Sequence, residues 1–258
     1  MTPLEFLIIF VAGIAAGFVN VVGGGGSLIA MPALIFLGLP SAVANGTSRV
    51  ALIVQSLVAI GYFKKKGYFY PKLSILLGIP AVIGSIIGAK FAISLSDEMF
   101  NRVLAVVMLT VLVLIIWRPE KKFIPSEEVV ENLSKPRLIM ASIIFFGIGF
   151  YGGFIQAGVG FIIIAGLAMV TGMSLVKINS IKVSVSLIFI FASLLVFVVN
   201  DKVDWVLGFV MALGNAIGAY WGSVFSVSKG DKWIRIFLIV TVLIMAAKLL
   251  EVHKWLGF

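Results

Sequence analysis

The chain has 258 residues, of which 61% are hydrophobic and only 12% are charged, a balance that excludes a soluble globular protein. The formal charge of +9 does not indicate a nucleic-acid partner, because Lys and Arg gather in short loops beside apolar segments, as they do in the cytoplasmic loops of membrane proteins. The absence of Cys and the presence of one His, His253, exclude disulfides and Cys/His metal sites.

Apolar segments follow one another along nearly the whole chain, and a membrane-spanning helix needs about 20 mostly apolar residues. In the first half they cover residues 4–22, 27–37, 42–63, 73–95 and 98–117. In the second half they cover residues 138–156, 161–170, 175–199, 205–227 and 233–250. The first segment lacks a basic n-region and a cleavage site, so we expect it to remain as a membrane segment. The sequence predicts an all-α polytopic membrane protein with about 8–10 membrane segments.

The second half resembles a copy of the first. The matched residues are Gly13, Gly17, Phe18 and Asn20 with Gly149, Gly153, Phe154 and Gln156, and then Gly24, Gly26, Gly38 and Asn45 with Gly158, Gly160, Gly172 and Asn179. Close helix packing is the alternative explanation for the glycines, but the ordered set ending in paired asparagines favours duplication. The predicted units are a membrane repeat over residues 1–118, a cytoplasmic linker over 119–136 and a second membrane repeat over 137–258.

Charge indicates how the two copies are oriented. The loop after the third segment of the first copy is basic, with three lysines at 64–66 and Lys72, and is expected in the cytoplasm. The polar stretch 118–137 and the loop 228–235 are the other two cytoplasmic candidates. The equivalent loop of the second copy, 200–204, holds Asp201 and Asp204 around Lys202 and is expected outside, as is the acidic turn at 97–98. The sequence therefore predicts inverted repeats.

In each copy a full-length apolar helix runs into glycines and then into a segment too short to span alone, which predicts a broken helix pair. The two sequences are VVGGGGSLIAMPALIFLGL and QAGVGFIIIAGLAMVTG. Glycines allow positive φ, and the short helix that follows presents free N–H groups and the positive end of its dipole toward the break. Such a site suits an anion, and inverted-repeat transporters place substrate at broken helix ends. The candidate residues are Gly24, Gly25, Gly26, Ser27, Gln156, Gly158 and Gly160.

After each short segment comes a polar patch inside an apolar helix. The first patch contains Asn45, Thr47, Ser48 and Arg49, and the second contains Asn179, Ser180 and Lys182. Helical spacing places the amide and the cation of each patch on one face. A charge within the membrane is a functional-site hypothesis by default. The alternative is that Arg49 snorkels or pairs with helix-end carbonyls, and for Lys182 the two interpretations are equally supported.

Several functions lose support because the required residues are absent. No acidic residue lies firmly within an apolar segment, which disfavours a cation or proton carrier. No nucleophile with a base and no metal-ligand set appears, so an intramembrane enzyme is disfavoured. No P-loop GxxxxGK[ST] is present, which argues against direct ATP drive. No cofactor is expected.

The pattern resembles the TauE/SafE family of membrane proteins, the sulfite-exporter family. The resemblance rests on GFVNVVGGGGSLIAMPALIFLGLP, on the following ANGTS-type helix, and on a second copy with GFYGGFIQAGVGF and INSIKVS. The second copy departs most, with Gly-Val-Gly for the glycine run and Ile181 in place of Thr47. The resemblance implies transport of sulfite, sulfonates or related organosulfur anions across the inner membrane.

We therefore expect a multi-pass secondary transporter of the cell membrane that binds a small anion. Two broken helices would meet near the midplane and hold an oxyanion between helix N-termini, Asn45 and Asn179, assisted by Arg49 and Lys182. The expected partners are that anion, the lipid bilayer and, as an option, further copies of the chain, but not nucleic acid. The main alternative is a membrane scaffold or assembly factor, in which glycines serve packing and buried cations pair with carbonyls.

Overall fold

The computed structural model of the protein describes residues 2–104, 106 and 135–249; the side chain of Lys135 and those of residues 230–249, except Trp233 and Ile236, fall outside it. Every regular element in this part of the chain is a helix, which confirms the predicted all-α fold. The helices are α1 (Pro3–Val22), α2 (Ser27–Phe36), α3 (Ser41–Lys65), α4 (Pro71–Ser94), α7 (Lys135–Phe154), α8 (Val159–Thr171), α9 (Leu175–Val199) and α10 (Trp205–Leu249). A short helical stretch covers residues 97–104.

Within the described residues, six helices are long and apolar enough to cross a membrane, and α2 and α8 are shorter apolar helices. The 10 residues of α2 extend only about 15 Å, half of a hydrocarbon core of about 30 Å. Most of the predicted segment over 98–117 and residues 119–134 of the predicted linker lie outside the described residues, and the last two linker residues, 135 and 136, are the start of α7.

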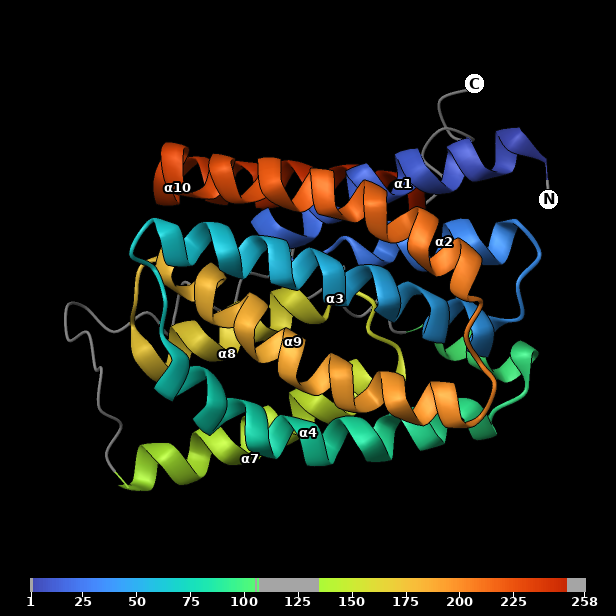
Figure 1. Ribbon diagram of the computed structural model, residues 1–258. Helices are drawn as coiled ribbons and strands as arrows, with labels where there is room; N and C mark the ends of the chain where they lie inside the picture. The colour runs from blue at the N-terminus through green and yellow to red at the C-terminus, as the bar shows by residue number, and fades with distance from the viewer. Residues whose placement is uncertain (1, 105, 107–134, 250–258) are drawn as a thin grey trace.

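The helices form two layers, and each layer contains helices from both halves of the chain. The upper layer of Figure 1 holds α1, α2, α3 and α10, and the lower layer holds α4, α7, α8 and α9. α4 thus packs with the second half, and α10 packs with the first. The layers meet where α3 packs against α9, and these two helices run in opposite directions, as α1 and α7 do (Figure 1).

The structure corrects one predicted loop. Residues 228–235 were expected to separate two segments, but α10 is helical without interruption from Trp205 to Leu249. A single Gly within helix-forming neighbours costs only about 1 kcal/mol, which is less than the loss of several backbone hydrogen bonds in a membrane. The stretch Trp205–Lys229 of this helix is long and apolar enough to cross a membrane.

Glycines allow the first helix of each half to lie directly against the backbone of a helix from the other half of the chain. A Cβ added at any of four glycines would press into the backbone of its partner. The contacts are those of Gly13 with Met211, Gly17 with Asn215, Gly149 with Ala81 and Gly153 with Ser85. The α1–α10 and α7–α4 interfaces thus use equivalent positions, which favours the predicted duplication and shows that these glycines serve close packing.

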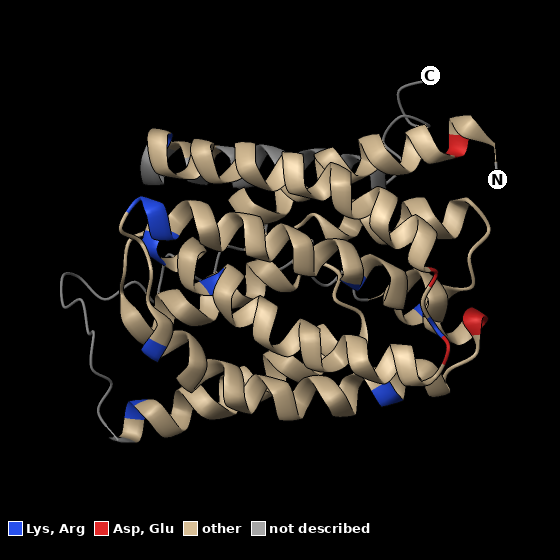
Figure 2. Ribbon diagram, in the orientation of Figure 1, with Lys and Arg blue, Asp and Glu red and all other residues tan. Residues whose placement is uncertain are grey.

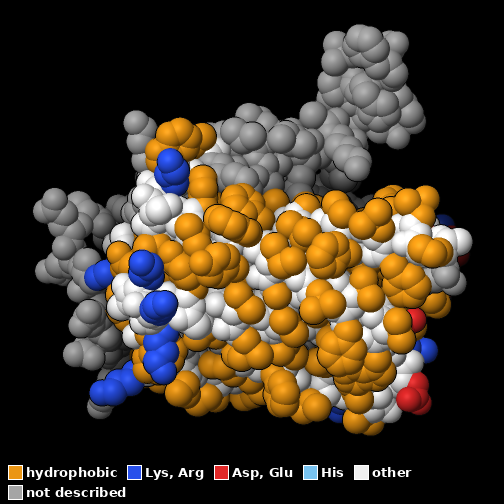
Figure 3. Space-filling view, turned by 45° about the horizontal axis from the view of Figure 1, so that its top comes forward, with side chains coloured by type: hydrophobic (Ala, Val, Ile, Leu, Met, Phe, Trp, Pro, Cys, Tyr) orange, Lys and Arg blue, Asp and Glu red, His pale blue; other side chains and the backbone are white. Residues whose placement is uncertain are grey.

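Charged residues separate to the two ends of the bundle. Figure 2 shows most Lys and Arg at the end that carries the α3–α4 loop, and Asp and Glu at the end that carries the α9–α10 loop. Hydrophobic side chains cover the face between these ends (Figure 3). This is the surface of a protein whose solvent is the bilayer, with the basic end expected in the cytoplasm.

Candidate functional site

Both helix breaks have the backbone geometry that the sequence predicts. The first break joins α1 to α2 over residues 23–26, and the second joins α7 to α8 over residues 155–158. Gly24 has φ of +88° and Gly158 has φ of +69°, conformations that glycine adopts without steric cost. Gln156 takes φ of +66°. Positive φ is uncommon for a residue with a side chain, and such residues cluster at functional sites.

The two breaks contact each other. A Cβ at Gly24 would collide with the backbone of Gly160, and a Cβ at Gly160 would collide with Gly24. Ser27 Oγ donates to the carbonyl oxygen of Gln156 at 2.8 Å and accepts from the N–H group of Gly158 at 3.3 Å. The first turn of α2 is thereby hydrogen-bonded to the second break.

The expectation of free N–H groups at the starts of the short helices is wrong for Leu28, Ile29 and Phe161. In α2 the N–H groups of Leu28 and Ile29 donate to the carbonyl oxygens of Gly25 and Gly26, and in α8 that of Phe161 donates to Gly158. The tight turns of the breaks bring these carbonyls within reach, so the loop backbone satisfies donors that would otherwise face a ligand.

Arg49 lies at the centre of a buried polar cluster and has no exposed surface. Its Nη1 donates to Ser193 Oγ at 2.6 Å and to Gln156 Oε1 at 3.3 Å. Its Nη2 donates to Asn45 Oδ1 at 3.1 Å and to the carbonyl oxygens of Gly152 and Gly153 at 3.1 and 2.6 Å. Those carbonyls end α7, where the helix dipole favours a cation.

One donor of Arg49 is left over, because Nε is buried and has no hydrogen-bond partner. A buried donor without a partner carries a desolvation cost of about 1–3 kcal/mol. The face of Phe197 lies 4.7 Å from the guanidinium carbon, which adds a cation–π contact. The cluster therefore holds a full positive charge and an unused N–H group without a carboxylate among its partners.

Lys182 forms a second cluster of the same design. Its Nζ donates to Asn179 Oδ1 at 2.9 Å and to the carbonyl oxygens of Asn20 and Val21 at 2.9 and 2.8 Å. Asn179 Nδ2 donates to the carbonyl oxygen of Val22 at 3.2 Å. In the first cluster Asn45 Nδ2 likewise donates to the carbonyl oxygen of Phe154, at 2.7 Å. Each amide and cation thus caps the first helix of the opposite half.

The structure separates the two predicted patches instead of joining them in one clamp. Arg49 contacts Ser193, which lies eleven residues (193 − 182) beyond Lys182 on α9, or about 16 Å along the helix. Because α3 and α9 run in opposite directions, equivalent positions near their starts lie at opposite heights. Gln156 links the Arg49 cluster to the breaks, which lie between the two cations.

Two predicted residues have other contacts. Thr47 Oγ1 accepts from the N–H group of Asp204 at 2.8 Å, and so it fixes the loop between α9 and α10. Ser48 Oγ donates to the carbonyl oxygen of Asn45 in its own helix. Both hydroxyls are thus hydrogen-bonded to backbone groups outside the breaks.

Sequence reasoning missed Ser193, which makes one of the shortest hydrogen bonds of Arg49. A lone Ser in a long apolar run was the only available signal. Nothing in the sequence indicates that the carbonyl groups of Gly152 and Gly153 accept hydrogen bonds from Arg49, because every residue carries a carbonyl group.

Comparison with known proteins gives a consistent result. The family described as "Sulfite exporter TauE/SafE" matches residues 9–249. A probable membrane transporter protein of Haemophilus influenzae is 28% identical over 251 residues, covering 97% of this chain and 96% of that protein. The probable membrane transporter protein YfcA of Escherichia coli K12 is 27% identical over 266 residues, covering 100% of this chain and 96% of that protein. The probable membrane transporter protein YdhB of Bacillus subtilis is 27% identical, covering 86% and 89%. No solved structure matches.

Proposed function

Because the chain belongs to the sulfite exporter TauE/SafE family of membrane transporters, we propose that it is a secondary transporter of a small oxyanion, with sulfite or a related organosulfur anion as the first candidate. It is a multi-pass membrane protein with six candidate spans in its described part. The family name and the chemistry of the two buried clusters support an anionic substrate.

The uncompensated charge of Arg49 and Lys182 is the observation that carries this proposal. Both side chains are almost completely buried, at 0% and 2% exposure, and all their hydrogen-bond acceptors are neutral groups. A helix C-terminus contributes only about half of a negative charge. An anion that enters between the layers would complete the neutralisation of these cations.

The arrangement of the two clusters suggests how access alternates. Arg49 in α3 holds α7 of the other layer, and Lys182 in α9 holds α1, so each cation ties the two layers at a different height. We propose that the layers rock about the contact between Gly24 and Gly160. An anion that replaces the α7 carbonyls as the hydrogen-bond acceptor of Arg49 would let the layers separate on one side of the membrane. The same replacement at Lys182 would let them separate on the other side.

A membrane scaffold remains the second candidate, and one observation favours it. All the hydrogen bonds of Arg49 and Lys182 are made within the protein, so both residues already have a structural role in helix capping. In a scaffold these contacts would be permanent, and no soluble anion would compete for them.

Thermal unfolding of the purified protein in detergent tests this proposal. Sulfite, sulfate, thiosulfate, an alkyl sulfonate and acetate would be added at equal ionic strength, with chloride as reference. A ligand at about 100 times its Kd stabilises the folded state by about 2.7 kcal/mol. We expect at least one sulfur oxyanion to raise the unfolding temperature above that in chloride.

The control is a pair of charge-matched variants. Arg49→Gln should lose the anion-dependent shift, whereas Lys90→Gln, which removes an exposed positive charge, should keep it. If no anion shifts the wild-type protein, or if both variants respond equally, the transporter site is wrong and the scaffold is the better description.

A further inference from the structure

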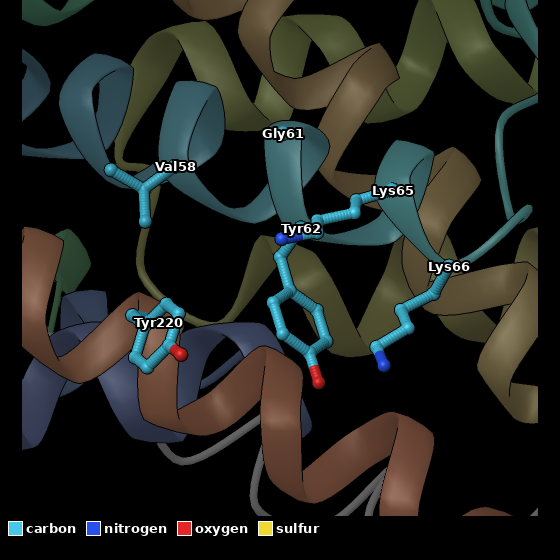
Figure 4. Close-up of a pocket in the computed structure, with 6 residues that line it drawn as sticks. All are labelled: Val58, Gly61, Tyr62, Lys65, Lys66 and Tyr220. Atoms are coloured by element: carbon cyan, nitrogen blue, oxygen red, sulfur yellow. The ribbon is translucent and has the colours of Figure 1, made fainter.

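A second basic site lies away from the helix breaks, between the last turns of α3 and the middle of α10. It is a pocket of about 390 Å³ (Figure 4). The pocket is lined by Val58, Gly61, Tyr62, Lys65, Lys66 and Tyr220. Figure 4 shows the Tyr62 ring extending from α3 towards α10, which supplies Tyr220. Its volume is in the range of small-molecule binding sites, about 300–1,000 Å³.

The pocket has two positive charges and no negative one among its lining residues. Lys65 and Lys66 are exposed, and Lys66 Nζ lies 5.9 Å from the centre of the Tyr62 ring. The Tyr62 and Tyr220 rings meet edge to face at 5.7 Å. In the part of the chain that the structure describes, the one ion pair joins Arg102 to Glu98, which are not in this pocket. Ammonium and phenol groups together are donors suited to a phosphate oxygen.

The position of the pocket relates it to the membrane surface. Lys65 is the last residue of a candidate membrane span, and the surrounding end of the bundle is basic (Figure 2). Towards the middle of the bilayer the same two helices expose large apolar side chains. These are Leu57, Leu213 and Ile217, which are between 43% and 64% exposed.

Helical spacing connects these apolar side chains to the pocket. Leu57, Gly61 and Lys65 follow one another at intervals of four residues on α3. On α10, Leu213, Ile217 and the lining residue Tyr220 follow one another at intervals of four and three residues. Two lipid-facing rows therefore lead directly to the basic lining. Such a surface fits a molecule with an anionic head and long apolar chains.

We propose that this pocket binds the phosphate group of an anionic phospholipid, with its acyl chains along the two exposed apolar rows. The ammonium groups of Lys65 and Lys66 and the hydroxyl groups of Tyr62 and Tyr220 donate to the phosphate oxygens. Basic pockets between membrane helices at the cytoplasmic surface bind anionic lipid head groups in this way. The site is independent of the transport proposed above, because it uses none of the residues at the breaks.

Native mass spectrometry of the detergent-solubilised protein tests the site by counting bound lipids. The protein would be titrated with phosphatidylglycerol and, as the neutral reference, with phosphatidylcholine. We expect one tightly retained phosphatidylglycerol molecule. The double variant Lys65→Gln/Lys66→Gln should bind it about tenfold more weakly, since each Lys near a charged lipid surface contributes substantially to binding.

The matched control is the double variant Lys64→Gln/Lys72→Gln, which loses the same charge outside the pocket and should bind like wild type. Equal binding by both double variants would overturn the proposal. Inorganic phosphate and glycerol 3-phosphate form the second arm of the experiment. If millimolar amounts of either displace the lipid, the pocket is a site for soluble oxyanions and the assignment to a lipid is wrong.

Discussion

The two buried cation clusters share a design but differ in strength. In both, an amide and a cation from a long central helix cap the carbonyl end of the first helix of the opposite half. Arg49 has five hydrogen bonds and an aromatic face, whereas Lys182 has three hydrogen bonds. A guanidinium group is a fixed planar fork and an ammonium group is a compact charge. The duplication therefore provides one scaffold with two sites of different chemistry.

The two halves also differ in the polar contacts that α10 makes with α3 and that α4 makes with α9. Asn215 Nδ2 donates to Gln55 Oε1 at 3.3 Å between α10 and α3, and Asn215 Oδ1 is buried without a partner. At the equivalent place between α4 and α9, Ser85 Oγ donates to the carbonyl oxygen of Phe189 at 3.0 Å. The contact between α10 and α3 is thus more polar than the equivalent contact between α4 and α9. Four predictions test how far the two halves differ.

The largest expected effect concerns the orientation of the two loops across the membrane, because a cysteine either reacts from outside the cell or does not. The chain contains no Cys, so single cysteines can be labelled selectively. Asn200→Cys, in the loop after α9, should react with a membrane-impermeant maleimide added to intact cells, because that loop belongs to the acidic end. Lys64→Cys, at the end of α3, should react only after the cells are permeabilised. The reverse pattern would show that the charge bias was misread.

A side chain at the contact between the breaks should have the next largest effect. Gly24 and Gly38 both have positive φ, at +88° and +93°, but only at Gly24 would a Cβ meet other atoms. Gly38→Ala should therefore cost about 1 kcal/mol of stability from backbone strain alone. Gly24→Ala should cost several times more. SDS titration of the protein in mixed micelles measures both stability losses. Equal losses would show that the close contact between Gly24 and Gly160 is not important for stability.

Removing either cation tests the difference between the clusters directly. Truncating one partner of a buried, hydrogen-bonded charge typically costs about 2–5 kcal/mol. Arg49→Gln should lie near the upper end and Lys182→Gln near the lower end, because Arg49 has more partners. Arg49→Lys keeps the charge but loses the fork, so its cost should be intermediate. The same SDS titration ranks the three variants, and a larger loss for Lys182→Gln would reverse the comparison.

The smallest effect is expected at Ser193. Ser193→Ala removes one acceptor from Arg49 and should cost about 1.5 kcal/mol, the lower end for a hydrogen bond to a charged group. Ser184→Ala is the control, because Ser184 Oγ bonds only the carbonyl oxygen of Ser180 within the same helix. A midpoint shift for Ser193→Ala no larger than that of Ser184→Ala would mean that Arg49 does not depend on this hydroxyl.

Much of the fold could be predicted because membrane helices are encoded locally. The predicted segment over residues 175–199 coincides with α9. The predicted segments over 4–22, 42–63, 73–95 and 138–156 differ from α1, α3, α4 and α7 by at most three residues at either end. The loop over 228–235 was wrong, because charged residues in a row look like a loop but also continue a helix. Of the site, the amide and cation pairs were predicted to share a helix face, and the hydrogen bond from Arg49 to Asn45 has this geometry. Their separation into two clusters could not be predicted without the relative direction of α3 and α9.

The sequence by itself determined the helices, the two glycine breaks and the basic and acidic ends, because each depends on local composition and on neighbours a few residues apart. Only the tertiary structure decided that α4 and α10 exchange layers, that Gly24 meets Gly160, and that Arg49 and Lys182 face helix carbonyls. Carbonyl groups are present at every residue and carry no sequence signal. Which of them a buried cation reaches depends on how distant helices pack, and close packing is set by the whole set of contacts at once.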